Sequence, residues 1–157
     1  AHMTTGLEHD ALGRRTEHTE IRKEQVEKRQ RKVETARERE DWSPREFGDA
    51  DADLLVVSWG STEGPMREAV EILADEGIAV RFLSVPYLHP RPDLADAIET
   101  AERTVVVECN AEGQFANVIE RDVLERVERI NKYDGVRFTA DELAAEIRER
   151  LAQEVPR

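Results

Sequence analysis

The chain has 157 residues, of which 37% are charged and 39% hydrophobic, a size and balance that allow one folded domain with an appendage but not two domains. It carries 35 acidic and 23 basic side chains, and the formal charge of -12 repels phosphate backbones and anionic membranes, which argues against nucleic acid or a membrane surface as a partner. No apolar stretch approaches the roughly 18 residues needed to cross a bilayer, and no secretion signal is recognisable, so we expect a cytoplasmic protein.

The composition also limits the chemistry that the chain can carry. A single cysteine, Cys109, excludes an internal disulfide and any metal cluster held by several thiolates of this chain. His9, His18 and His89 lack the close spacing of a zinc site. The basic residues comprise 19 Arg and only 4 Lys, and an acid-rich, lysine-poor surface is typical of a halophile protein.

The first part of the chain is predicted to be an arm spanning residues 4–52. Residues 1–3 resemble the remnant of an expression tag, so we expect native sequence to begin at Thr4 and the chain to be a piece of a longer protein. Residues 19–40 contain no Gly or Pro and place glutamates four residues before basic side chains, which predicts a helix. Its apolar stripe is thin, so the helix is either a solvated connector or lies across the body or a neighbour.

The body, residues 53–157, begins with alternating strands and helices. Continuous apolar runs are typical of strands buried on both faces, and apolar residues three and four apart indicate one buried helix face. The predicted strands lie at 53–59, 78–85 and 104–109, and the predicted helices at 66–74 and 94–101. This order indicates right-handed crossovers over a parallel sheet, so the predicted fold class is α/β.

The second half of the body continues the pattern with a helix, a segment that fits two structures, and a final helix. Periodicity alone does not separate a longer helix over 121–132 from a helix followed by a strand. We favour a strand at about 127–132, because the turn residues at 133–135 would then mark the end of that strand. Thr139 and Glu142 have capping-box spacing and predict the start of the last helix.

Ligands of open parallel sheets collect outside the carboxyl ends of the strands, where the loop after the first strand lies. This loop, Gly60-Ser61-Thr62-Glu63-Gly64, offers small residues, two hydroxyls and N–H groups at a helix start. It matches neither the phosphate-loop pattern nor the dinucleotide fingerprint, and Glu63 would oppose a phosphate. The loop is therefore either an anion site or a tight turn in which Ser61 or Thr62 caps the helix.

The loop after the third strand carries polar groups to the same edge. Glu108, Cys109 and Asn110 either form a polar patch in a cleft, or Cys109 is a small buried hydrophobe and Asn110 a helix cap. Ser84 lacks the sequence context of a catalytic serine, so no catalytic residue is predicted. The candidate cleft residues are Gly60, Ser61, Thr62, Glu108, Asn110 and Gln114.

Several stretches, taken together, resemble the alpha subunit of 2-oxoacid:ferredoxin oxidoreductases. The similar motifs follow the family's order along nearly the whole native chain: Thr5–Gly13, Val57–Thr62, Arg67–Val70, Tyr87–Pro90, Val107–Gln114 and Phe138–Leu143. The first stretch is similar to the segment that leaves that subunit's pyrimidine-binding domain. The others are similar to its carboxyl-terminal domain.

The resemblance implies a three-layer fold like the carboxyl-terminal domain of transketolase, with a mostly parallel, mixed sheet of about five strands flanked by helices. It also implies a holoenzyme that uses thiamine diphosphate, Mg and an iron–sulfur cluster to decarboxylate a 2-oxoacid, reduce ferredoxin and form an acyl-coenzyme A. The chain lacks the family's Tyr-Pro-Ile-Thr-Pro stretch, a Gly-Asp-Gly site and any Cys pair. We therefore expect this piece to bind none of these cofactors and to be inactive alone.

The expected partners are the N-terminal part of the alpha subunit and the beta subunit, with ferredoxin reached through the holoenzyme. The expected role is scaffolding, with the loops around Ser61 and Asn110 shaping the approach of coenzyme A. Two other functions stay open: a stand-alone nucleotide-binding or small-ligand module of flavodoxin-like fold that uses the Gly60–Gly64 loop, and an interaction domain whose arm docks another protein. The residues do not distinguish pyruvate, 2-oxoglutarate and branched 2-oxoacids as substrates.

Overall fold

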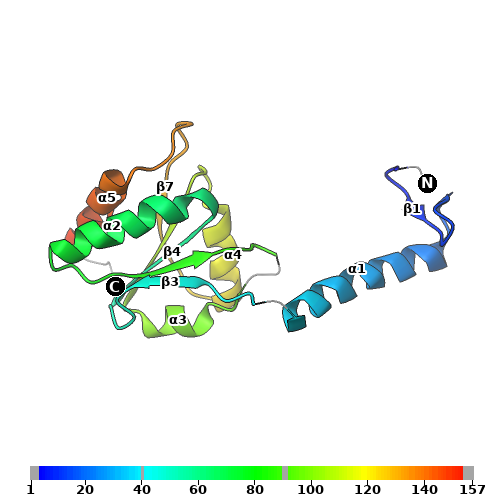
Figure 1. Cartoon of the computed structure of the whole chain (residues 1–157), viewed down its shortest axis with the longest axis horizontal. Coiled ribbons are helices and arrows are strands. Elements are labelled where there is room, and N and C mark those ends of the chain that lie inside the picture. The colour runs from blue at the N-terminus through cyan, green and yellow to red at the C-terminus, as the bar shows by residue number, and fades with distance from the viewer. Residues whose placement is uncertain (1–3, 40, 90–91, 154–157) are drawn as a thin grey trace. The chain divides into compact units, whose positions relative to one another are not determined.

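The computed structural model describes residues 4–39, 41–89 and 92–153. The chain divides into two compact units, which we call the arm, Ala1–Asp41, and the body, Trp42–Arg157 (Figure 1). Within the described residues, no helix combines the length and the apolar character needed to cross a bilayer.

The arm consists of a small hairpin and one long helix. Strands β1 (Glu8–His9) and β2 (Arg15–Thr16) pair antiparallel, and α1 (Thr19–Arg39) confirms the predicted helix. No residue of α1 is buried. The hairpin is held to α1 by Glu8, whose carboxylate accepts two hydrogen bonds from Arg29 at 2.6 and 3.0 Å. The sequence analysis missed this hairpin, because strands of two residues have no detectable periodicity.

The body contains a five-stranded mixed sheet in the order β3-β5-β4-β6-β7. Four strands are parallel neighbours, and β3 pairs antiparallel with β5 at one edge. The strands are β3 (Arg45–Gly48), β4 (Leu54–Trp59), β5 (Arg81–Val85), β6 (Arg103–Glu108) and β7 (Glu128–Asn131). The mostly parallel α/β fold is therefore confirmed, and β7 confirms the strand that we favoured at 127–132.

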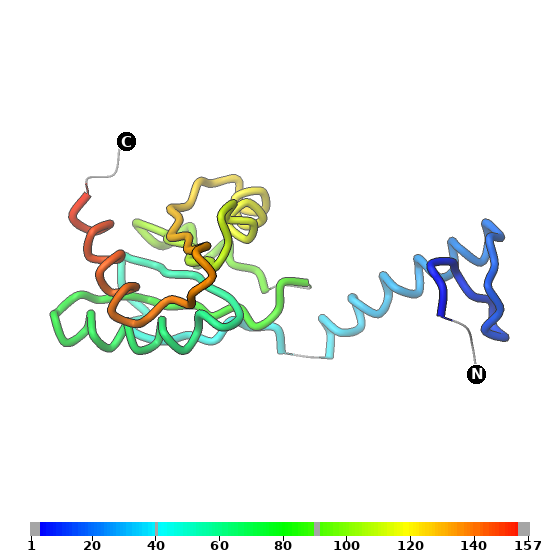
Figure 2. Tube along the Cα trace, turned by 90° about the horizontal axis from the view of Figure 1, so that it is seen from above, coloured from blue at the N-terminus to red at the C-terminus, as the bar shows by residue number. Residues whose placement is uncertain are grey.

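Helices cover both faces of the sheet and create two separate hydrophobic clusters. One face is covered by α2 and α5, which run side by side, and the other by α3 and α4 (Figures 1 and 2). Alternate residues of β4 enter opposite clusters, Leu54 and Val56 on one face and Leu55 and Val57 on the other. This two-sided burial explains the continuous apolar run of β4. The helices are α2 (Glu63–Asp75), α3 (Ala95–Thr100), α4 (Gln114–Val123) and α5 (Ala140–Ala152).

The edge strand β3 lies within the segment that the sequence analysis assigned to the arm, residues 4–52. In the structure the body begins at Trp42, earlier than the predicted boundary at 53. Only Phe47 of β3 packs inward, stacking on Phe82 with ring centroids 5.6 Å apart. With a single inward residue, β3 has no alternation of apolar and polar residues, so the sequence does not predict this strand.

The last helix begins as its sequence predicts. The Thr139 hydroxyl accepts from the Glu142 N–H at 3.2 Å, and the Glu142 carboxylate accepts from the Thr139 N–H at 2.9 Å. This capping box satisfies two backbone donors at the helix start. From this start α5 packs beside α2.

Candidate functional site

The carboxyl ends of β4 and β6 form the topological switch point of the sheet. The two strands are neighbours, yet the chain leaves β4 toward β5 on one side and leaves β6 toward β7 on the other. Ligands of open α/β sheets collect at such a point, because the two departing loops leave a crevice between them. The switch-point loops, residues 60–62 and 109–113, are the two that the sequence singled out. The two loops contact each other where the Thr62 hydroxyl oxygen lies 3.9 Å from the Cys109 sulfur.

The loop after β4 is a tight turn. Gly60–Thr62 form one 3-10 turn that leads directly into α2, and Gly64 already belongs to that helix. Gly60 has φ +65°, a conformation that favours glycine. Thr62 is buried and occupies the N-cap position without a side-chain capping bond, which corrects the expectation that it caps the helix. Ser61 is exposed at the tip of the turn.

Glu63 determines the electrostatic character of the α2 amino terminus. Its carboxylate accepts two hydrogen bonds from Arg45 at 2.9 and 3.0 Å and one from the buried Ser84 hydroxyl at 2.6 Å. A negative side chain here already interacts with the positive end of the helix dipole. An incoming phosphate would meet a carboxylate at this position, so the structure gives no support to a nucleotide site built on the Gly60–Gly64 loop.

Glu108 is a structural residue. It is 1% exposed, and its carboxyl oxygens accept hydrogen bonds from the N–H groups of Phe115 and Ala116, both at 2.9 Å. The Asn110 side-chain amide donates a third bond to it at 2.7 Å. These bonds satisfy backbone donors at the start of α4, which otherwise lack partners. The expectation that Glu108 faces an open cleft is therefore wrong.

Some neighbouring residues of this loop form hydrogen bonds that hold its backbone, and others are exposed to solvent. The Asn110 side-chain oxygen accepts from the N–H groups of Gly113 at 2.7 Å and Gln114 at 3.3 Å and so closes the loop before α4, although the N-cap position of that helix is Gly113 and not Asn110. The Asn131 side-chain amide donates to the Asn110 carbonyl at 2.9 Å and ties the loop to β7. Cys109 is exposed, which corrects the interpretation of it as a small buried hydrophobe. Gln114 is also exposed and remains open to a ligand.

A second polar network braces the end of β7, and the sequence analysis missed it. The Lys132 ammonium donates to both carboxylate oxygens of Glu142 at 2.8 Å and to the Arg137 carbonyl at 3.3 Å. The hydrogen bond with Glu142 raises the pKa of Lys132, and the bonds from Lys132 and the Thr139 N–H lower the pKa of Glu142. No sequence signal could have found this network, because it joins a strand end to a helix cap across a loop.

The exposed groups at this edge suit contact with a ligand or another protein. Trp59 is 36% and Tyr87 51% exposed, and they accompany Ser61, Cys109 and Gln114. The two acidic residues that border the loops, Glu63 and Glu108, are hydrogen-bonded within the fold, whereas Glu112 of the second loop is exposed. Among the described residues, no three His, Cys, Asp or Glu side chains gather as a metal site. The geometry supports binding and positioning at this edge and assembles no acid–base or nucleophile pair.

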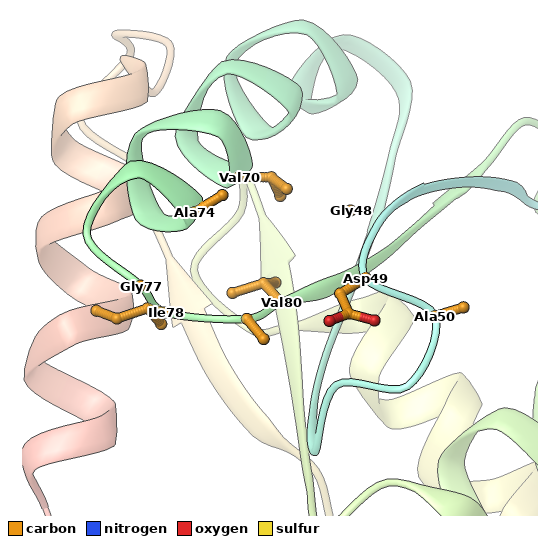
Figure 3. A pocket seen from close by; sticks show the side chains of 9 residues that line it. Gly48, Asp49, Ala50, Val70, Ala74, Gly77, Ile78 and Val80 are labelled. Carbon is orange, nitrogen blue, oxygen red and sulfur yellow. The ribbon is translucent and has the colours of Figure 1, made fainter.

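One pocket of the body lies away from this edge. It has a volume of about 550 Å³ and lies between the carboxyl half of α2, the end of β3 and the start of β5 (Figure 3). None of the candidate cleft residues lines it. It therefore represents a separate feature of the surface.

Comparison with known proteins gives a consistent picture. Residues 52–143 match the family model described as pyruvate:ferredoxin oxidoreductase core domain II. The chain is 38% identical over 121 residues to a 2-oxoacid:ferredoxin oxidoreductase alpha subunit of Aeropyrum pernix, covering 74% of this chain and 19% of that protein. It is 37% identical over 103 residues to the 2-oxoglutarate oxidoreductase subunit KorA of Mycobacterium tuberculosis, covering 65% of this chain and 16% of that protein.

Two solved structures share the fold. A 2-oxoglutarate:ferredoxin oxidoreductase from Magnetococcus marinus with 2-oxoglutarate, coenzyme A and succinyl-CoA bound matches 96% of this chain and 27% of its own, with a TM-score of 0.74 and 26% identity. The alpha chain of a probable 2-oxoacid ferredoxin oxidoreductase from Thermoplasma acidophilum matches 72% of this chain and 100% of its own, with a TM-score of 0.52 and 28% identity. The chain thus spans about a fifth of the curated relatives named above.

Proposed function

Since this chain belongs to the pyruvate:ferredoxin oxidoreductase core domain II family, as found in 2-oxoacid:ferredoxin oxidoreductase alpha subunits, we propose that it works as one domain of such a subunit. The observation that carries the proposal is the family match over 52–143, which includes both switch-point loops. The complete enzyme would oxidatively decarboxylate a 2-oxoacid, form an acyl-coenzyme A and reduce ferredoxin. The stand-alone nucleotide module is not favoured, because the Glu63 carboxylate, which pairs with Arg45, lies at the α2 amino terminus and would repel a phosphate there.

The cofactors of that reaction would be thiamine diphosphate with Mg and an iron–sulfur cluster, and the described residues do not fit them. A single cysteine does not hold a cluster, and the carboxylates of Glu63 and Glu108, which border the switch-point loops, already accept hydrogen bonds within the fold. These groups would therefore be bound by the N-terminal part of the alpha subunit and by the beta subunit. The chain would act by packing against those parts and orienting them.

The proposed contribution of the body to the reaction is at the carboxyl edge. The exposed Gly60, Ser61 and Gln114, with the backbone held by Asn110, would border the path by which coenzyme A reaches the acyl group. Small side chains and rigid backbone suit such a passage, because they leave room and do not have to reorganise.

The first experiment tests the domain assignment. We expect the isolated chain to show no 2-oxoacid-dependent reduction of ferredoxin or of a redox dye. The same chain, joined to the rest of the alpha subunit and mixed with beta, should support this reduction in the presence of coenzyme A. Turnover by the isolated chain, or no need for the chain in the complex, would contradict the proposal.

The second experiment tests the coenzyme A path in the complete enzyme. Gln114→Phe places a bulky side chain at the carboxyl edge, and Gln153→Phe places the same side chain at the end of α5 as a matched control. We expect Gln114→Phe to raise KM for coenzyme A several-fold, about what one misplaced contact costs, with little change in KM for the 2-oxoacid. Equal effects of the two variants would argue against a passage at this edge.

We further propose that the protein works in a salt-rich cytoplasm. Its 25 acidic and 13 basic side chains from Trp42 onward place the whole net charge of -12 on the body. A surface with this excess of carboxylates favours solubility in concentrated salt. Measuring the salt dependence of the stability of the body, as argued below, tests this proposal.

A further inference from the structure

The carboxyl edge of the sheet carries aromatic side chains on its β4–β5 half. Trp59 ends β4 and is 36% exposed, and Tyr87 and Leu88, on the loop after β5, are 51% and 37% exposed. Trp59 is in register with Val85, so Tyr87 follows two residues later at the neighbouring strand end. Trp42 packs edge-on against Tyr87, with ring centroids 4.6 Å apart. We call Trp42, Trp59, Tyr87 and Leu88 the aromatic patch.

The aromatic patch gathers residue types that are rare in this chain. Aromatic residues make up 5% of the sequence, yet both tryptophans and one of the two tyrosines belong to the patch. Tryptophan and tyrosine are enriched among the residues that dominate binding energy in protein interfaces. A single exposed apolar residue is ordinary, whereas a group of large ones indicates a contact surface.

The patch also lacks charge, although 37% of the sequence is charged. The described residues 59–62 and 86–89 include no Asp, Glu, Lys or Arg, and Glu63, which follows the first of these stretches, is paired with Arg45. The opposite edge instead exposes carboxylates: Asp49, Asp51, Asp53 and Glu102. Aromatic residues without charged neighbours are typical of the core of a protein interface.

The chemistry of the patch suits a protein better than a nucleotide. Aromatic rings can stack a base, but the phosphates of a nucleotide need basic partners. Residues 59–62 and 86–89 supply no such partner, and the nearby Arg45 is already paired with Glu63. The patch therefore fits an apolar protein surface.

The course of the chain indicates which protein surface this is. Trp42 is the first residue of the body, so the polypeptide enters the body at the patch. Most of the length of the relatives lies outside the match, which covers 19% of the Aeropyrum pernix subunit and 27% of the Magnetococcus marinus chain. A part of the subunit that precedes this chain would be tethered at this edge, and tethering favours an intramolecular contact over a free partner.

We propose that the aromatic patch docks an apolar, charge-poor face of the preceding part of the same alpha subunit. This contact rests on the proposed function, because it requires the chain to be one domain of such a subunit. It gives the two halves of the carboxyl edge different tasks. The β4–β5 half packs against protein, and the crevice between β4 and β6 stays open for coenzyme A. An apolar contact also withstands the salt-rich cytoplasm proposed above, since it does not depend on ion pairs.

The first test is hydroxyl-radical footprinting of the isolated chain and of the complete alpha subunit, with mass spectrometry to measure the oxidation of each side chain. Trp59 and Tyr87 should react in the isolated chain and be protected several-fold in the complete subunit without beta. Tyr133, which is 72% exposed, is the matched control for Tyr87 and should react in both samples. Protection should persist as KCl rises from about 0.1 to about 1 M, although the Debye length then falls from about 10 to about 3 Å.

Equal oxidation of Trp59 and Tyr87 in the two samples would overturn the proposal. Protection that is already present in the isolated chain, or that appears only with beta or with coenzyme A, would also overturn it, because a different partner would then cover the patch. Loss of the protection at high salt would show an ionic contact and would contradict the proposal as well.

The second test removes the centre of the patch with Trp59→Ala and Tyr87→Ala together. This double variant should lower the melting temperature of the complete alpha subunit by several degrees more than that of the isolated chain, because only the subunit contains the docked face. Tyr133→Ala with Val136→Ala, which changes two exposed side chains on the loop after β7, should show no such difference. Equal shifts of the patch variant in both samples would assign these side chains to packing within the body alone and overturn the proposal.

The two proposals fail separately in these experiments. A complete subunit that supports turnover with beta while Trp59 and Tyr87 stay reactive would refute the docking and leave the domain assignment intact. A complex that does not need this chain for turnover would refute the domain assignment itself.

Discussion

Glu108 lies at the end of the central strand β6 with almost no exposure, where a charged residue is costly unless every oxygen has a partner. Two backbone N–H groups of α4 and the Asn110 amide supply these partners. The residue thereby locks the first turn of α4 to the strand that precedes it. The switch-point loop between them is held by this side chain together with the bonds of Asn110.

We expect Glu108→Ala to lower the free energy of unfolding by about 3 kcal/mol, because it leaves three donors without an acceptor in a buried place. Glu108→Gln should cost less, since its remaining oxygen still accepts from part of this set. Urea unfolding measures both. Glu112→Ala, an exposed neighbour on the same loop, should change the value by no more than about 0.5 kcal/mol, and a similar loss there would contradict the explanation.

The single residue Glu142 should make the stability of the fold depend on pH. Lys132 and the Thr139 N–H lower its pKa in the folded state, so the folded protein holds the ionised form more tightly than the unfolded chain does. This contribution to stability is present above the ordinary pKa of a glutamate and is lost as the pH falls through the lowered value.

The melting temperature of Glu142→Gln should therefore lie below that of the unaltered protein at neutral pH, and the gap should close on acidification. Thermal unfolding across pH measures this. Glu146→Gln, at a half-buried position on the same helix, serves as the comparison. A gap that stays constant with pH would mean that packing, rather than charge, causes the difference.

At the scale of elements, β3 is attached to the sheet through a close backbone approach. Gly48 ends the strand at φ +83°, and a Cβ atom there would lie 2.1 Å from the Val80 carbonyl oxygen. The Asp49 N–H also donates to this carbonyl at 3.0 Å. Only glycine allows both the left-handed turn and the contact, so this residue decides whether the edge strand can join.

Gly48→Ala should destabilise the body by more than about 2 kcal/mol, because the backbone must move away from β5. Gly77→Ala isolates the conformational part of the effect, since Gly77 has φ +79° with no atom within 4 Å of an added Cβ. That control should cost about 1 kcal/mol. Equal losses, measured by urea unfolding, would show that the close approach contributes nothing.

At the scale of the whole molecule, the charge is distributed unevenly between the two units. The arm has 10 acidic and 10 basic residues, whereas the body has 25 and 13. Self-repulsion therefore acts mainly within the body, where it opposes compaction. The arm, by contrast, carries no net charge.

Added KCl should raise the melting temperature of the body, because screening reduces repulsion among its carboxylates as the Debye length falls to about 3 Å at 1 M. Asp51→Asn with Glu102→Gln removes two exposed charges and should make the salt dependence shallower. Scanning calorimetry in a KCl series measures both. A melting temperature that falls with salt would contradict the adaptation to concentrated salt.

The sequence by itself determined the central architecture and the family. β4 and β6 were predictable because burial on both faces requires a continuous apolar run, and α5 because its capping box and apolar row are local patterns. The two switch-point loops were located for the same reason, since the ends of parallel strands follow from the strand order.

Only the tertiary structure decided how the polar residues of those loops are used. Glu63 pairs with Arg45 of an edge strand that has no sequence signal, and Glu108 is buried under the first turn of α4, where it accepts from the N–H group of Ala116 eight residues away. These hydrogen-bond partners are determined by how whole helices and strands pack together, so the local sequence pattern does not predict them. The hydrophobic periodicity of a sequence indicates which side chains are buried. The hydrogen-bond partner of a polar side chain depends instead on which residues the tertiary fold places next to it.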